Sequence, residues 1–129
     1  MIIGNGIDII DINRIRRVID KYGNRFKKRC FSISEIERSE KRLNSVESFA
    51  KRYAAKEALS KALGIGFRNN LNFKDIEILN DKLGKPYYFK SKKITNIISK
   101  KFKTKRYNLF LSITDEKDYS IAFTILQSQ

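Results

Sequence analysis

The chain has 129 residues, 41% of them hydrophobic, and its 28 Lys and Arg against 14 Asp and Glu give a formal charge of +14. This length and composition predict one globular domain over residues 1–129. We find no membrane-spanning segment and no signal-peptide pattern, so we expect a cytoplasmic protein without a membrane partner. The sequence has no histidine and one cysteine, Cys30, which excludes an internal disulfide, a Cys/His zinc cluster and a Ser-His or Cys-His nucleophile pair.

The first predicted element is a strand over residues 2–12, an isoleucine-rich segment in which apolar side chains alternate imperfectly. The alternation places Asp8 on the same face as Ile10 and Ile12. A carboxylate on an apolar strand face is unusual, because burying an unpaired charge is costly. Asp8 is therefore a candidate site residue.

Two short helical segments follow the strand. The pattern of residues 13–22 predicts a helix with Asn13 as its N-cap and a buried stripe of valine and isoleucine. Further along, a Ser-x-x-Glu pattern from Ser34 to Glu37 predicts a capped helical turn.

The most informative segment is a predicted helix over residues 45–63, which Gly64 and Gly66 should end. This helix is apolar nearly all round. At about 100° per residue, the carboxylate of Glu57 shares its side with apolar residues of the preceding turns. Glu57 is therefore expected to have a cation, a metal or a strong hydrogen-bond donor beside it.

The remaining segments are predicted mainly as strands. The expected elements are a strand over residues 73–79, a turn at 82–86, an extended segment at 87–89, a basic helix over 91–102, and two closing strands over 107–113 and 119–126. Together the segments predict an α+β fold, with an antiparallel sheet formed mainly late in the chain and one long central helix.

Asp8 and Glu57 form the first candidate site. Each carboxylate has a structural interpretation, since Asp8 could pair with an Arg or cap a backbone group and Glu57 could pair with a Lys. Two such carboxylates in a chain without soft ligands favour a shared hard cation, Mg²⁺. Lys61, at i+4 from Glu57, forms either an ordinary helix pair or a contact to a phosphate held at the same place. The Gly64–Gly66 segment is first a helix C-cap and second a flexible approach to a ligand.

Four segments occur in the order and at the spacing of one family's motifs. They are Gly-Ile-Asp-Ile leading to Arg at 6–14, Phe-Ser-Ile-Ser-Glu at 31–35, Arg-Tyr-Ala-Ala-Lys-Glu-Ala-Leu-Ser-Lys-Ala-Leu-Gly at 52–64, and Gly-Lys-Pro at 84–86. From end to end, the sequence resembles the holo-[acyl-carrier-protein] synthases, the small bacterial type of 4′-phosphopantetheinyl transferase, and their fold.

The resemblance implies Mg²⁺-dependent transfer of 4′-phosphopantetheine from coenzyme A to a serine of apo-acyl carrier protein, in support of fatty acid biosynthesis. Asp8 and Glu57 would bind Mg²⁺ with the coenzyme's pyrophosphate, and Lys61 would contact the phosphates. The serine hydroxyl would attack the β-phosphorus and release adenosine 3′,5′-bisphosphate. Glu57 or a metal-bound water would act as the base.

The resemblance also implies a homotrimer with the nucleotide site between neighbouring subunits. Gly64 and Gly66 would then lie near the coenzyme, and Lys85 and Pro86 would approach its adenosine end across the interface. The acidic carrier would dock on basic side chains of the first helical region. These are Arg14, which matches the family motif, and Arg17, Lys21 and Arg25, which match in character; a solvated helix face remains the alternative for Arg17 and Lys21.

One position departs from the family pattern. Asp115 stands where the family has a His with an auxiliary role in binding or proton transfer. Asp115 either adds a hydrogen-bond acceptor at this position or is a turn residue. Loss of the His would make turnover slower. Two other functions remain open. One is a small basic RNA-binding domain, an interpretation that gives no role to Asp8 and Glu57. A synthase, in contrast, is expected to have no nucleic-acid partner. The other is a catalytically degenerate module that only docks the carrier protein.

Overall fold

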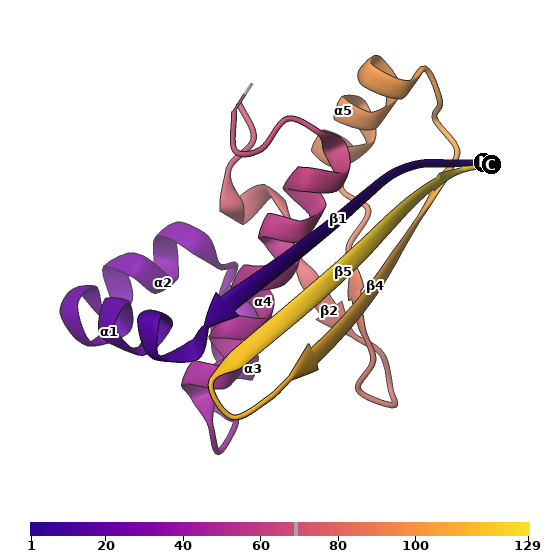
Figure 1. Ribbon diagram of the computed structural model, residues 1–129. Helices are drawn as coiled ribbons and strands as arrows, with labels where there is room; N and C mark the ends of the chain where they lie inside the picture. The colour runs from indigo at the N-terminus through magenta and orange to yellow at the C-terminus, as the bar shows by residue number, and fades with distance from the viewer. Residues whose placement is uncertain (69) are drawn as a thin grey trace.

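The long helix α4 crosses one face of a three-stranded sheet, and the other helices lie around it (Figure 1). This arrangement comes from a computed structural model that describes residues 1–68 and 70–129. The elements in chain order are β1 (Ile2–Asp11), α1 (Ile12–Tyr22), α2 (Asn24–Cys30), α3 (Ile33–Glu40), α4 (Ser45–Leu63), the 3₁₀ helix η1 (Phe73–Asp75), β2 (Ile78–Asn80), β3 (Pro86–Tyr88), α5 (Lys92–Phe102), β4 (Tyr107–Asp115) and β5 (Tyr119–Ser128).

The sheet has the strand order β1-β5-β4 and is antiparallel throughout, and β2 and β3 form a separate antiparallel pair. The predicted α+β class and central helix are confirmed. The prediction that the sheet forms mainly late in the chain is incomplete, because the N-terminal strand β1 pairs along β5, with Asp8 opposite Ala122. β1 and β4 are therefore the two edges of the sheet.

Two glycines of β1 allow α4 to approach the sheet closely. A Cβ atom at Gly4 would overlap the carbonyl oxygen of Ala62, and a Cβ atom at Gly6 would overlap that of Ala58. Such overlaps show that the helix backbone rests directly on the strand. As a result Asp8, which follows on the same face of β1, lies beside α4.

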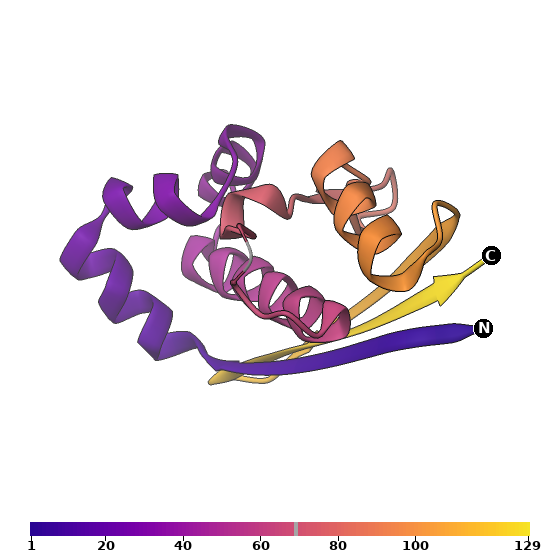
Figure 2. The same ribbon diagram turned by 90° about the horizontal axis from the view of Figure 1, so that it is seen from above.

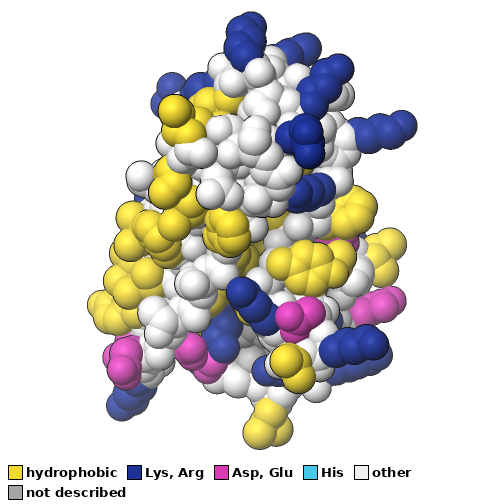
Figure 3. All heavy atoms as spheres, turned by 90° about the vertical axis from the view of Figure 1, so that its right-hand side faces the viewer, with side chains coloured by type: hydrophobic (Ala, Val, Ile, Leu, Met, Phe, Trp, Pro, Cys, Tyr) yellow, Lys and Arg dark blue, Asp and Glu magenta, His cyan; other side chains and the backbone are white. Residues whose placement is uncertain are grey.

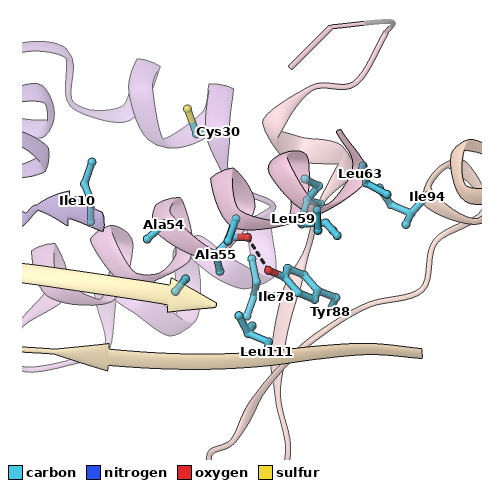
Figure 4. Packing of buried hydrophobic residues seen from close by; sticks show 14 of the residues in the cluster. Ile10, Cys30, Ala54, Ala55, Leu59, Leu63, Ile78, Tyr88, Ile94 and Leu111 are labelled. Carbon is cyan, nitrogen blue, oxygen red and sulfur yellow. Dashed lines mark hydrogen bonds between the residues drawn. The ribbon is translucent and has the colours of Figure 1, made fainter. Parts of the chain in front are cut away.

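Helix α4 is buried on nearly every side, as its composition predicts. Its alanines at 50, 54, 55 and 58 and Leu59 are 0% exposed. The hydroxyl of Tyr88 donates to the Ala55 carbonyl oxygen at 2.6 Å, which ties β3 to the middle of the helix (Figure 4). The helix ends at Gly64 in the left-handed conformation, with φ of 73°, as a glycine C-cap requires.

The other helices lie on either side of α4 in the view from above, with α1 to α3 at one end and α5 at the other (Figure 2). Cys30, the single cysteine, is free and 6% exposed. No helix within residues 1–68 and 70–129 has both the length and the apolar character needed to cross a membrane.

Several local predictions are wrong. Ile12 begins α1 instead of ending β1, and the N-cap of α1 is Asp11, whose side chain accepts from the amide of Asn13. The Ser-x-x-Glu cap starts at Ser32, not Ser34, and Ser32 and Glu35 form a full capping box.

The expected strand over residues 73–79 divides into η1 and the short strand β2, since Asn72 and Asp75 form a capping box around a 3₁₀ turn. Helix α2 is not predicted by the sequence analysis at all. It contains one fully buried residue, Cys30, so its apolar periodicity is weak.

Candidate active site on β1 and α4

Asp8 and Lys61 form a direct bridge between β1 and α4. The Lys61 ammonium donates to Asp8 Oδ1 at 3.1 Å and to the carbonyl oxygen of Ile7 at 3.0 Å. The Asp8 side chain is 14% exposed, whereas that of Lys61 is 53% exposed. Lys61 therefore neutralises Asp8 from the solvent side, and its flexible stem leaves it free to reach another anion.

Glu57 lies one turn before Lys61 and shares its electrostatic environment with Asp8. Burial raises the pKa of Glu57, the charge of Asp8 raises it further, and Lys61 and Arg14 oppose the shift. Burial also raises the pKa of Asp8, against the hydrogen bond from Lys61. The fold thus brings together the three residues that the sequence analysis selected, with Arg14 as a fourth charge nearby.

An aromatic wall borders the carboxylates. The ring of Tyr53, one turn before Glu57, stacks on Phe73 with centroids 4.9 Å apart, and Phe73 stacks on Phe67 at 3.8 Å. Burial and the charge of Glu57 raise the pKa of the Tyr53 hydroxyl. The carboxylates therefore lie beside a partly apolar surface, which favours close interactions with a ligand.

The four basic residues expected to dock a partner are all exposed. Arg14, Arg17 and Lys21 lie on α1 at helical spacing, and Arg25 lies on α2. Arg14 lowers the pKa values of both Asp8 and Glu57, so this end of α1 adjoins the carboxylates. The basic face thus leads toward the carboxylates.

The glycines after α4 lie on a different side from the docking residues. Gly64 is exposed and lines a basic pocket together with Arg68, Lys100 and Lys101, beside α5. Gly66 has φ of 59° and open space where a Cβ atom would lie. Gly64 therefore acts first as the C-cap of α4, as the sequence indicates.

A second basic pocket lies toward the other edge of the sheet. It is lined by Arg38, Lys41, Arg42 and Arg52, together with Gly84, Pro86 and Ile113 of β4. Pro86 thus belongs to this pocket, while Lys85 is exposed next to it. Asp8 on β1 and Ile113 on β4 both pair with Ala122 of the central strand β5, so this strand and α4 lie between the two sites.

Asp115, at the position where a His was expected, is the last residue of β4. Its carboxylate lies 3.7 Å from the ammonium of Lys51, which also pairs with Glu47 at 3.2 Å. Lys51 lines the pocket that contains Pro86. Asp115 therefore ends a strand and forms an ion pair next to this pocket, and its part at the position of the family's His stays a prediction.

The sequence analysis missed the buried charges of α4. Lys56 and Arg52 are 0% and 5% exposed, more buried than Glu57, and Glu35 on α3 is 1% exposed. The signal that selected Glu57, a charge on an apolar helix, applies equally to Lys56 and Arg52. Lys56 and Arg52 pair with Glu35 inside the protein, and this contact with a distant segment is not visible in the sequence.

The donor set fits Mg²⁺ bound together with a phosphate ligand. Within residues 1–68 and 70–129, no group of three or more His, Cys, Asp or Glu side chains could hold a metal ion by itself. Mg²⁺ typically uses one or two carboxylates and completes its shell with phosphate oxygens and water. Asp8 and Glu57 match that pattern, and the Lys61 ammonium already marks this place as favourable for a cation.

The outer face of the sheet carries an apolar surface that no other element within residues 1–68 and 70–129 covers. Its exposed members include Ile7, Ile9, Phe110, Tyr119 and Phe123, from all three strands. Figure 3 shows hydrophobic side chains gathered along one side of the molecule, with Lys and Arg side chains at its upper end and again, beside Asp and Glu, in its lower part. Apolar surfaces of this kind mark interaction sites.

Comparison with known proteins gives one consistent result. Residues 4–124 match the family model of the 4′-phosphopantetheinyl transferase superfamily. The chain is 51% identical over 128 residues to the holo-[acyl-carrier-protein] synthase of Pelagibacter ubique, which covers 99% of this chain and 98% of that protein.

Solved structures agree with the sequence relatives. The holo-[acyl-carrier-protein] synthase of Neisseria meningitidis superposes with a TM-score of 0.87 at 35% identity, covering 99% of this chain and 100% of that one. The synthase of Bacillus anthracis, in complex with CoA (3′,5′-ADP), superposes with a TM-score of 0.81 at 36% identity, covering 100% of this chain and 99% of that one.

Proposed function

The chain belongs to the 4′-phosphopantetheinyl transferase superfamily, and we propose that Asp8, Glu57 and Lys61 form the reaction centre of a holo-[acyl-carrier-protein] synthase. This enzyme transfers 4′-phosphopantetheine from coenzyme A to a serine of apo-acyl carrier protein and releases adenosine 3′,5′-bisphosphate. The single observation behind the assignment is the meeting of two partly buried carboxylates with a mobile ammonium, on a strand and a helix from distant parts of the chain.

Asp8 and Glu57 would hold Mg²⁺, which would neutralise charge on the coenzyme's pyrophosphate. Lys61, whose long side chain is half exposed, would contact the phosphates of the coenzyme. Glu57 or a metal-bound water would accept the proton of the attacking serine hydroxyl.

The basic residues of α1 and α2 form the docking face for the carrier. Arg14, Arg17, Lys21 and Arg25 are exposed and adjoin the carboxylates through Arg14, so an acidic carrier bound there presents its serine near Glu57. Complementary charge of this kind mainly raises the association rate and selects the partner.

The proposed assembly is a homotrimer built on the apolar outer face of the sheet. Its support is that apolar face itself, whose exposed members come from all three strands of the sheet. A neighbouring copy would supply Lys85, Pro86 and the pocket arginines to the coenzyme held at Lys61, Gly64 and Gly66. Residues 1–129 then form one domain of a cytoplasmic enzyme in fatty acid biosynthesis.

A mass-spectrometric assay tests the proposal. Apo-acyl carrier protein incubated with the enzyme, coenzyme A and Mg²⁺ should gain the mass of one phosphopantetheine, and EDTA should prevent the gain. Asp8→Ala and Glu57→Gln should lower the rate at least about 100-fold, because each removes a metal ligand. Circular dichroism must show that both variants remain folded, and Glu37→Gln, on an exposed part of α3, serves as the charge-matched control. Full activity in both site variants would reject the proposed reaction centre.

A further inference from the structure

A buried ion pair lies inside the fold, one residue from Glu57. The side chains of Lys56 and Glu35 are both 0% exposed, and Lys56 Nζ lies 2.7 Å from Glu35 Oε1. An ion pair of this kind adds little net stability, because desolvation offsets most of the attraction. Stability alone therefore does not explain why these two charges are in the core.

Lys56 uses all three of its ammonium protons inside the protein. They go to Glu35 at 2.7 Å, to the carbonyl oxygen of Cys30 at 2.7 Å and to that of Phe73 at 3.1 Å. These acceptors belong to the end of α2, the first turn of α3 and the start of η1. One side chain of α4 therefore fixes three neighbouring segments at defined distances from the helix.

The contacts of Lys56 also affect the position of Glu57 in the proposed reaction centre. Phe73, held through its carbonyl oxygen, stacks its ring on Tyr53 at 4.9 Å, and Tyr53 lies one turn before Glu57. Lys56 and Glu57 are also consecutive on one rigid helix, so their side chains diverge by about 100°. Holding Lys56 toward Glu35 thereby sets the direction in which Glu57 points.

Glu35 connects the same helix to the basic pocket. Its Oε2 accepts from the amide of Ile78 at 3.1 Å and lies 4.0 Å from Arg52 Nη1. Arg52 in turn donates to the Ile78 carbonyl oxygen at 2.7 Å and to Asn80 Oδ1 at 2.8 Å, and it lines the pocket that contains Pro86. A single carboxylate thus holds β2 and the pocket arginine in register with α4.

We propose that Glu35 and Lys56 are positioning residues that orient the Glu57 carboxylate on one side of α4 and Arg52 in the basic pocket on the other side. The inference rests on the proposed function, since it concerns how coenzyme A and the metal are held. Neither residue contacts the substrate; both act through the residues that they anchor.

The test uses a double variant, Glu35→Gln with Lys56→Met, which removes both charges and keeps nearly the same volume. Removing one partner alone would leave a buried unpaired charge and unfold the protein, so the double variant is preferred. At a temperature well below its melting point, we expect kcat to fall at least about tenfold. The KM for coenzyme A and the Mg²⁺ concentration for half-maximal rate should each rise by a similar factor. Calorimetry should show the same loss of coenzyme A affinity without turnover.

A purely structural role makes a different prediction. It would lower the melting temperature and the fraction of active molecules, while leaving KM and the Mg²⁺ midpoint unchanged, and that result would overturn the inference. Glu35→Asp, one methylene shorter and still charged, gives a second variant if the double variant does not fold, and it should show the same pattern in milder form. Wild-type KM and Mg²⁺ midpoint in folded Glu35→Asp would equally reject the inference.

Two controls separate this result from the proposed function. Lys27→Met with Glu40→Gln removes a more exposed pair, 3.4 Å apart, and should leave both constants unchanged. The wild-type protein should transfer phosphopantetheine and bind coenzyme A. If it does neither, the proposed function fails together with the inference built on it, whereas wild-type activity with an unaffected double variant rejects the positioning role alone.

Discussion

Asp8 and Glu57 reduce the stability of the metal-free protein. Burial raises the pKa of both carboxyls, and Asp8 raises that of Glu57 further. A pKa that is higher in the folded state means that the folded protein binds the proton more tightly than the unfolded chain. Stability therefore falls as pH rises through the window that starts at the unfolded pKa of each carboxyl. Charged residues that are needed for function commonly lower the folding stability of a protein in this way.

Glu57→Gln should accordingly stabilise the metal-free protein, by about 1 kcal/mol at pH 7. The gain should disappear below about pH 4, where Glu57 is protonated in both folded and unfolded states. Urea unfolding at the two pH values measures it. Added Mg²⁺ should raise the melting temperature of the wild type but not of the variant. A variant less stable than wild type at pH 7 would contradict the expected repulsion.

Ser120 has a buried hydroxyl without a partner. Its residue is 0% exposed, and its Oγ makes no hydrogen bond within residues 1–68 and 70–129. Because an unsatisfied buried polar group is unfavourable, Ser120→Ala should raise the free energy of unfolding by about 1 kcal/mol. Thr124→Val, four residues further along β5 on the same face, is the matched control. It should destabilise, since Thr124 Oγ1 pairs with the Tyr88 hydroxyl at 2.6 Å.

At the scale of elements, the sequence near α4 predicts where this helix begins and ends. The structure of the segments packed around α4 depends on contacts between residues that are far apart in the chain. The bounds of α4 follow from Asn44, whose side chain caps the first turn, and from Gly64 at its end, both readable in sequence. The Ser-x-x-Glu pattern occurs twice, at residues 32–35 and 34–37, and local sequence does not distinguish them. The ammonium of Lys56, 21 residues from Glu35, makes the first one the cap.

In the candidate site, too, some features follow from local spacing and others from contacts between distant residues. Lys61 at i+4 from Glu57 is a local spacing and was predicted from it. The bond of Lys61 to Asp8 joins residues 53 positions apart and depends on how closely β1 approaches α4, which a local pattern does not specify. The buried role of Lys56 was missed for the same reason.

Gly6 should be essential for that approach. A Cβ atom there would overlap the Ala58 carbonyl oxygen, so Gly6→Ala must push α4 away from β1 and separate Asp8 from Lys61. We expect a loss of stability of about 3 kcal/mol and a large loss of transfer activity. Chemical denaturation and the mass assay measure the two effects. Glu37→Gln, on an exposed part of α3, should change neither, and a wild-type-like Gly6→Ala would refute the close packing.

For the whole molecule, the central issue is whether the two candidate binding regions of one site come from one subunit or from two. The carboxylates belong to the β1 edge, and the basic pocket reaches the β4 edge. Under the proposed trimer, each complete site takes one region from each of two neighbouring subunits. Two differently damaged chains should then be able to repair each other.

Subunit mixing tests this complementation. Glu57→Gln lacks the reaction centre, and Arg42→Glu reverses a charge in the pocket, so each protein alone should show strongly reduced transfer. After joint unfolding and refolding, about one interface in four should pair an intact reaction centre with an intact pocket, because subunits assemble at random. About a quarter of the wild-type rate should return. No recovery, with assembly confirmed by sedimentation, would show that each subunit works alone.

The pairing of β1 with β5 has a consequence for how the protein is made. β1 is made before the other described strands, its partner β5 is made after them, and the register joins Ile2 to Gln127. Until β5 emerges, β1 has no partner in the sheet, and its isoleucines are open to contacts with other nascent chains. Asp8 can be fixed beside α4 only after β5 has been made. Catalytic competence is therefore acquired in the final step of folding, and slow release of the last strand would prolong the period in which the chain is prone to aggregate.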